Sequence, residues 1–117
     1  MENSQYYPGM ITDEMISLSP DVFSPDNDGV DDVLNISYSL EAPGYVGNIT
    51  IFDREGRIVK YLLQSELLAT EGIISWDGTN NNLEKAPIGV YVVYFEVFDL
   101  DGNVSGVKKS TVVAGRF

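Results

Sequence analysis

Apolar and polar residues alternate strictly along an early segment of the chain, residues 34–40. The apolar positions are Leu34, Ile36, Tyr38 and Leu40, and the polar positions between them are Asn35, Ser37 and Ser39. Successive side chains of a strand point to opposite faces, so this period of two predicts a strand with one buried face. A shorter alternation of Ile16 and Leu18, ended by Pro20, predicts another strand before it.

Several later segments are rich in Val, Ile, Tyr and Phe and predict further strands. They are residues 48–52, 57–63, 73–76 and 89–98, with a last strand expected near 106–113. Residues 89–98 are apolar on nearly both faces, which suits a central strand of a two-layer fold. Residues 65–71 are compatible with a single helical turn but are too short to decide.

Two turns between these segments repeat one residue pattern. Asp53-Arg-Glu-Gly56 and Asp99-Leu-Asp-Gly102 each consist of Asp, any residue, an acid and Gly, and each follows an apolar pair, residues 51–52 or 97–98. Glycine readily adopts the positive φ that tight hairpin turns need. We therefore interpret the two segments as one hairpin turn used twice.

The spacing of about seven strands, with almost no helix, predicts an all-β fold, an antiparallel Ig-like β-sandwich. Tyr91 follows a Pro/Gly bend at the start of the central strand, where a tyrosine corner is expected. Residues 1–14 lack periodicity and are expected to be an N-terminal tail or linker, and residues 15–117 the sandwich module. The expected core includes Leu34, Ile36, Ile51, Val59, Val93, Phe95 and Val97.

Composition excludes several classes of function. The 117 residues include 18 acidic and 7 basic side chains, for a net charge of −11. Nucleic acid and anionic membrane surfaces are therefore poor partners, and no apolar run is long enough to insert into a bilayer. Cysteine and histidine are absent, which excludes Ser-His-Asp and Cys-His sites and the usual zinc sites. We expect the chain not to be an enzyme.

Four aspartates fall within the seven residues 26–32, Asp-Asn-Asp-Gly-Val-Asp-Asp. Calcium prefers six to eight oxygen ligands from carboxylates, carbonyls and water. Asp26, Asp28 and Asp32 stand at relative positions 1, 3 and 7 of a loop, the Val30 carbonyl stands at position 5, and Gly29 permits a sharp bend. The pattern predicts a structural calcium site on these four residues, with Asn27 and Asp31 either contributing ligands or stabilising the turn.

The two alternatives to this calcium loop are an EF-hand and an acidic turn without an ion. An EF-hand does not fit, because neither register of the loop gives both the glycine at position 6 and the glutamate at position 12. An acidic turn without an ion, in which Asp and Asn side chains accept hydrogen bonds from their own backbone, is the other interpretation.

The motifs together resemble a known family. Residues 22–32, Val-Phe-Ser-Pro-Asp-Asn-Asp-Gly-Val-Asp-Asp, are similar to the FxPNGDGxND signature of C-terminal Ig-like modules in secreted Bacteroidetes proteins. Residues 51–60, Trp76-Asp-Gly78 and Pro87-Ile-Gly-Val-Tyr91 follow in the order that those modules share. These modules include gliding-motility and type IX secretion-associated domains and lamin-tail-type surface proteins. The same order occurs in the Ig-like domain of flagellar hook-capping proteins.

The resemblance implies an extracellular or cell-surface module at the C-terminus of a larger polypeptide. No signal peptide is visible, so we expect an exported chain to be part of a larger precursor. Because residues 110–117 differ from the sorting-signal endings, the first expectation is a non-catalytic accessory module. The alternatives are a sorting module for type IX secretion, with the secretion machinery as partner, and a carbohydrate-binding module for a surface glycan. Its glycan-contact candidates are Trp76, Tyr45 and Tyr61.

Overall fold

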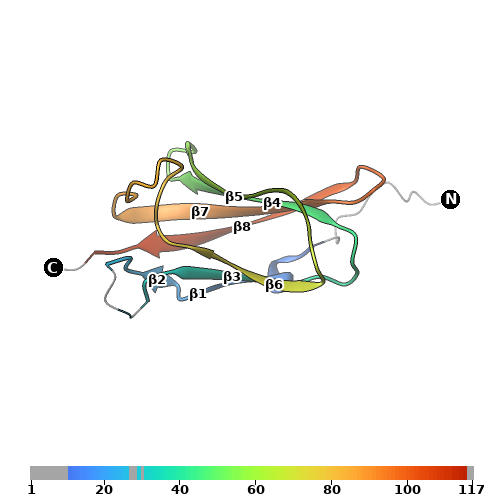
Figure 1. The fold of residues 1–117 in the computed structure, drawn as a ribbon, viewed down its shortest axis with the longest axis horizontal. Helices are drawn as coiled ribbons and strands as arrows, with labels where there is room; N and C mark the ends of the chain where they lie inside the picture. Colours follow the sequence, from blue (N-terminus) through green and yellow to red (C-terminus); the bar gives the residue numbers. More distant parts are fainter. Residues whose placement is uncertain (1–10, 27–28, 30, 116–117) are drawn as a thin grey trace.

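Two β-sheets pack face to face in the computed structural model, which describes residues 11–26, 29 and 31–115 (Figure 1). Eight strands are present within these residues: β1 (Ile16–Ser19), β2 (Val22–Phe23), β3 (Leu34–Ser39), β4 (Val46–Asp53), β5 (Ile58–Leu67), β6 (Glu71–Trp76), β7 (Gly89–Phe98) and β8 (Val104–Val113). A 3₁₀ turn, η1 (Asp13–Met15), precedes β1. The predicted β-sandwich is confirmed. In the described part of the chain, no helix has the length and apolar character needed to cross a membrane.

The smaller sheet has the order β1-β3-β6 and the larger sheet the order β2-β8-β7-β4-β5. All pairs are antiparallel except β2, which runs parallel to the end of β8, with Val22 opposite Val112. The chain therefore changes sheets between β1 and β2, at Pro20. Strand β2 is the one that the periodicity did not predict, because two residues are too few to show a period.

The core lies between the two sheets. Six of the seven predicted core residues are buried: Leu34, Ile36, Ile51, Val93, Phe95 and Val97. Val59 is only partly buried and packs at the margin of the core. The reason is its position in β5, the outermost strand of the larger sheet, which has a neighbouring strand on one side only.

Two expectations from the sequence concern residues 65–71 and the start of the sandwich module at residue 15. Residues 65–67 belong to the end of β5, so the helical turn considered for residues 65–71 is absent. Ser65 interrupts the strand with a φ of 51° and donates its N–H to the Asn48 side chain. The boundary at residue 15 stays a prediction, although Ile11 is buried and its N–H lies 3.3 Å from the Ser105 hydroxyl.

The loop between β6 and β7 covers part of the exposed edge of β5. The Asn81 N–H donates to the Val59 carbonyl over 3.0 Å, and the Asn81 side chain accepts from the Tyr61 N–H, also over 3.0 Å. Lys60 reaches the Asn80 carbonyl from the same strand. An uncovered strand edge is a template for pairing with other chains, and this loop occupies two of its backbone groups.

Candidate functional site

The four motifs of the sequence resemblance meet at one end of the sandwich, which we call the motif end (Figure 1). It is formed by the described part of the loop after β2, the β4–β5 turn, the segment after β6 and the bend before β7. Strand pairing brings Asp53 opposite Tyr91, and Gly78 packs against Pro25 and Phe23. Segments far apart in the sequence therefore build one surface.

Three buried aromatic rings form the interior of the motif end. The Trp76 ring lies edge-to-face against Phe23, with centroids 5.4 Å apart, and against Tyr91, with centroids 5.5 Å apart. The Trp76 indole N–H donates to the Thr79 carbonyl over 2.8 Å. One residue from each of three motifs thus meets in the core, and these motif residues have a structural role.

Tyr91 fixes the bend that precedes β7. Its hydroxyl donates to the Pro87 carbonyl, four residues earlier, which confirms the predicted tyrosine corner. Burial raises the pKa of the Tyr91 hydroxyl, and the nearby Asp53 carboxylate adds to the effect. The hydroxyl therefore keeps the proton that it donates.

The β4–β5 turn is organised by the Asp53 carboxylate. One of its oxygens accepts the N–H groups of Glu55 and Arg57, each over 2.9 Å, and the other accepts from the Arg57 guanidinium over 2.8 Å. Gly56 has a φ of 85° and donates its N–H to the Asp53 carbonyl. This is a three-residue hairpin loop that ends in a glycine bulge.

The β7–β8 turn repeats this geometry with Asp99. Its carboxylate accepts the N–H groups of Asp101 and Asn103, each over 2.9 Å, and Gly102 has a φ of 84°. The prediction of one turn used twice is confirmed.

Hydrogen bonds lower the pKa values of both turn aspartates. The largest contribution comes from the Arg57 N–H for Asp53 and from the Asn103 side chain for Asp99. A lowered pKa means that each ionised carboxylate stabilises the fold above the ordinary Asp pKa. The contribution is lost as the pH falls through the lowered values.

A third turn of the same form lies in the β6–β7 loop, where the residue pattern does not indicate it. The Asn80 side chain accepts the N–H groups of Asn82 and Glu84, over 2.9 and 3.0 Å, and the Leu83 N–H donates to the Asn80 carbonyl. Leu83 takes the place of the glycine, with a φ of 66°. The glycine that marks the other two turns is absent here, so the Asp and Gly spacing does not reveal this turn.

Replacing Leu83 by glycine is expected to raise the free energy of unfolding by about 0.5–1 kcal/mol. A left-handed conformation costs an L-residue roughly 1–2 kcal/mol, and glycine's greater freedom in the unfolded chain returns part of that gain. Leu83 is 75% exposed, so little packing is lost. Urea unfolding of both proteins measures the difference, and Gly56→Leu, the reverse change in the equivalent turn, should destabilise. A loss of stability in Leu83→Gly would contradict the assignment of this turn.

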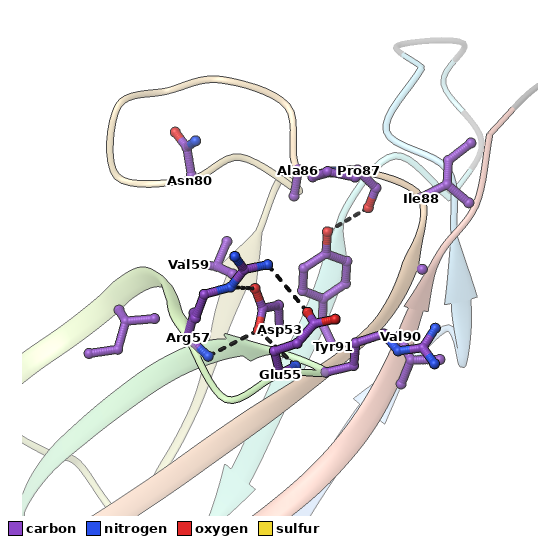
Figure 2. Close-up of a pocket in the computed structure, with 13 residues that line it drawn as sticks. Asp53, Glu55, Arg57, Val59, Asn80, Ala86, Pro87, Ile88, Val90 and Tyr91 are labelled. Carbon is purple, nitrogen blue, oxygen red and sulfur yellow. Dashed lines mark hydrogen bonds and ion pairs between the residues drawn. The ribbon is translucent and has the colours of Figure 1, made fainter.

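A hollow of about 340 Å³ opens beside the β4–β5 turn (Figure 2). Figure 2 shows Arg57 bridging Asp53 and Glu55, and the Tyr91 hydroxyl pointing to Pro87; all five residues line the hollow. Its apolar lining residues include Ile58, Val59, Ala86, Ile88 and Val90. Asp53 is held by two backbone N–H groups and a guanidinium, so it serves the turn and is not poised as an acid or base.

The Asp-rich loop is described only in part. The predicted calcium ligands Asp28 and Val30, and the additional candidate Asn27, lie outside the described residues. The Ser24 N–H donates to the Asp31 carbonyl over 2.8 Å, and the Asp32 carboxylate accepts the Gly29 N–H over 2.7 Å. Among the described residues, no group of three or more carboxylates could hold a metal ion, and Asp26 and Asp32 have further interactions. The calcium site therefore stays a prediction.

The three glycan-contact candidates lie apart in the fold. Trp76 is fully buried in the aromatic cluster, so it has no exposed ring face on which a sugar could stack. Tyr45 is partly buried against the core, and Tyr61 is 44% exposed on β5. The ring pairs found among the described residues all include a fully buried ring, and none of them is an exposed platform for a glycan.

Two of the solved structures that match this chain show the fold. One is PorZ from Porphyromonas gingivalis, described as an essential bacterial surface component of the type IX secretion system, with 20% identity and a TM-score of 0.55. The match covers 86% of this chain but only 12% of PorZ. The other is CopC from Methylosinus trichosporium OB3b, with 18% identity, a TM-score of 0.55, and coverage of 88% of this chain and 95% of CopC. At these identities the likeness shows the fold alone.

Comparison with sequences gives a more specific result. No curated protein matches this chain. A family model, the CHU_C type IX secretion signal domain, matches residues 17–113, from the second residue of β1 to the last residue of β8. The match includes all four motifs that meet at the motif end. The chain therefore belongs to the CHU_C type IX secretion signal domain family.

Proposed function

We propose that this module is a sorting signal that directs a larger polypeptide through type IX secretion to the cell surface or the medium. The family match over residues 17–113 is the observation that carries the proposal. It supports the sorting module, one of the alternatives drawn from the sequence, better than the accessory module that was expected first.

The module acts in this role as a folded recognition element without catalysis of its own. Its family is a secretion signal, and its motif residues serve the fold: Trp76 in the core, Tyr91 in the corner and Asp53 in the turn. Its partners are the rest of the parent polypeptide and a component of the secretion machinery. The carbohydrate-binding alternative loses its main candidate, because Trp76 is buried.

A reporter fusion tests the proposal. Residues 1–117 are joined to the C-terminus of a reporter that carries its own signal peptide, in a bacterium with type IX secretion and in an isogenic strain that lacks it. We expect the reporter on the cell surface or in the medium of the first strain, and in the periplasm of the second. CopC, which has a similar fold, is the matched control and should not export the reporter. Equal export by both strains, or periplasmic retention in both, would refute the sorting role.

We also propose that calcium stabilises the Asp-rich loop. Support comes from the density of carboxylates in residues 26–32 and from the closure of the loop by the bond between Ser24 and Asp31. An ion that binds only the folded loop must stabilise the fold.

Removal of calcium is expected to lower the melting temperature of the module. Extracellular calcium modules bind at about 0.1–1 mM. At free calcium ten times Kd the gain is about 1.4 kcal/mol, which is a shift of roughly four to eight degrees for a domain of this size. Thermal unfolding with calcium and with EDTA measures it, and Asp28→Ala should remove most of the response.

Asp31→Asn is the control for this prediction. It removes one negative charge but keeps a residue type that tolerates the φ of 51° found at this position. It should keep most of the calcium response. Identical melting of the wild-type module in calcium and in EDTA would leave the acidic turn as the correct interpretation.

A further inference from the structure

The outer face of the five-stranded sheet carries adjacent apolar side chains. Strand register places them in three cross-strand rows on this face, because they alternate with buried residues such as Ile51 and Val93. The rows are Val22–Val112–Val90, Ile58–Phe52–Val92 and Thr50–Tyr94–Lys108, and in the third row only Tyr94 contributes apolar surface. We call these residues, together with Arg54, the outer patch. Its members Val22, Ile58 and Val90 are 42–48% exposed.

The opposite outer face, on the three-stranded sheet, is polar. Its outward positions on the strands are Ser17, Ser19, Asn35, Ser37, Ser39, Glu71, Ile73 and Ser75, and Ile73 is the one large apolar side chain among these eight. If both outer faces only contacted water, the outer face of the five-stranded sheet could be as polar as this one. Contiguous exposed apolar surface on one face marks an interaction site.

Positive charge borders a hollow in the outer patch. The hollow, of about 460 Å³, is lined by Phe52, Asp53, Arg54, Gly56, Val92, Tyr94 and Lys108. The Lys108 ammonium lies 5.6 Å from the centre of the Tyr94 ring, within the range of a cation–π contact. Within the described residues, neither Arg54 nor Lys108 forms an ion pair.

The acidic side chains near this hollow already have partners. Asp53 is paired with Arg57, and Glu96 accepts hydrogen bonds from the Tyr94 hydroxyl and the Asn48 amide. The rest of the molecule is strongly acidic, and none of its Lys and Arg residues precedes Arg54. The outer patch is thus a largely apolar surface that carries two cations without an ion pair among the described residues, on a chain of net charge −11.

We propose that the outer patch is the surface by which the module is recognised during export, and that its occupant is an apolar polypeptide segment carrying carboxylates. The apolar rows bury against the segment, while Arg54 and Lys108 select its acidic groups. A second copy of the chain is disfavoured as occupant, because two chains of charge −11 repel one another. The inference rests on the proposed sorting function.

The reporter fusion also tests this inference, with one set of charge variants and one set of apolar variants, each with its own control. Arg54→Glu with Lys108→Glu should reduce export about tenfold or more, since like charges facing one another cost several times the thermal energy. Arg54→Gln with Lys108→Gln should reduce export less. Lys85 is an exposed cation in the β6–β7 loop, so Lys85→Glu is the charge control and should leave export unchanged.

The apolar variants test the other part of the surface. Ile58→Thr with Val90→Thr should reduce export severalfold, and Ile73→Thr, on the polar outer face, should not.

The results separate the inference from the sorting role. If the wild-type fusion is exported and the patch variants are exported equally well, the outer patch is not the recognition surface although the module still sorts. If the Arg54/Lys108 double variants to Glu and to Gln are exported equally, the assignment of an acidic occupant is wrong. Thermal unfolding of each purified module checks that the variants fold. A severalfold loss of export supports the inference only in variants that melt at the same temperature as the wild type. Self-association of the wild-type module in sedimentation, abolished by the Glu variant, would assign the patch to a second copy.

Discussion

Replacing Trp76 by alanine is expected to lower the free energy of unfolding by about 3–5 kcal/mol, a large part of the stability of a domain of this size. Trp76 is fully buried and makes edge-to-face contacts with Phe23 and Tyr91, so truncation leaves a cavity between the two sheets. The Thr79 carbonyl also loses the indole N–H that it accepts. Chemical denaturation of the wild-type and variant modules measures the loss.

Ile73→Ala is the matched control for Trp76→Ala. Ile73 lies on the same strand, β6, but its side chain is 66% exposed on the outer face. Its truncation should change the free energy of unfolding by no more than about 0.5 kcal/mol. A small effect of Trp76→Ala, similar to that of the control, would show that the aromatic cluster does not hold the motif end together.

Replacing Gly78 by alanine is expected to cost about 2–4 kcal/mol. Gly78 has a φ of 81°, and a Cβ there would lie 2.8 Å from Cγ of Pro25 and 3.5 Å from the Phe23 ring. The left-handed conformation costs an L-residue roughly 1–2 kcal/mol, reduced by the lower entropy of the unfolded chain. Overpacking against the rigid proline ring adds about 1–3 kcal/mol, because the ring cannot move aside as a long side chain would.

Gly56→Ala separates the two contributions to this loss. Gly56 has nearly the same φ, 85°, but a Cβ there meets nothing within 4 Å. It should therefore show the cost of the conformation alone, about 1 kcal/mol. Equal losses in the two variants, measured by the same denaturation experiment, would show that the contact between the Asp-rich loop and the segment after β6 does not contribute to stability.

Local patterns in the sequence determined the local structure. The alternation at residues 34–40 predicted β3, because a strand's side chains must alternate between core and solvent. The Asp and Gly spacing of residues 53–56 predicted the β4–β5 hairpin turn. The Asp side chain is short and accepts N–H groups of residues close to it in sequence, and glycine supplies the positive φ. Tyr91 was assigned to a tyrosine corner for the same reason: its hydroxyl bonds four residues away.

The tertiary structure decided what depends on partners distant in the chain. Trp76 is a core residue because Phe23 and Tyr91, from two other strands, surround it. Leu83 is held in a left-handed turn by a loop that docks onto β5, against its intrinsic preference. The two-residue strand β2 exists only because β8 offers it an edge. The outer patch likewise joins residues 22, 54, 58, 90 and 108, which the sheet brings together. Period and turn chemistry act over a few residues, whereas a surface is assembled by packing across the whole chain.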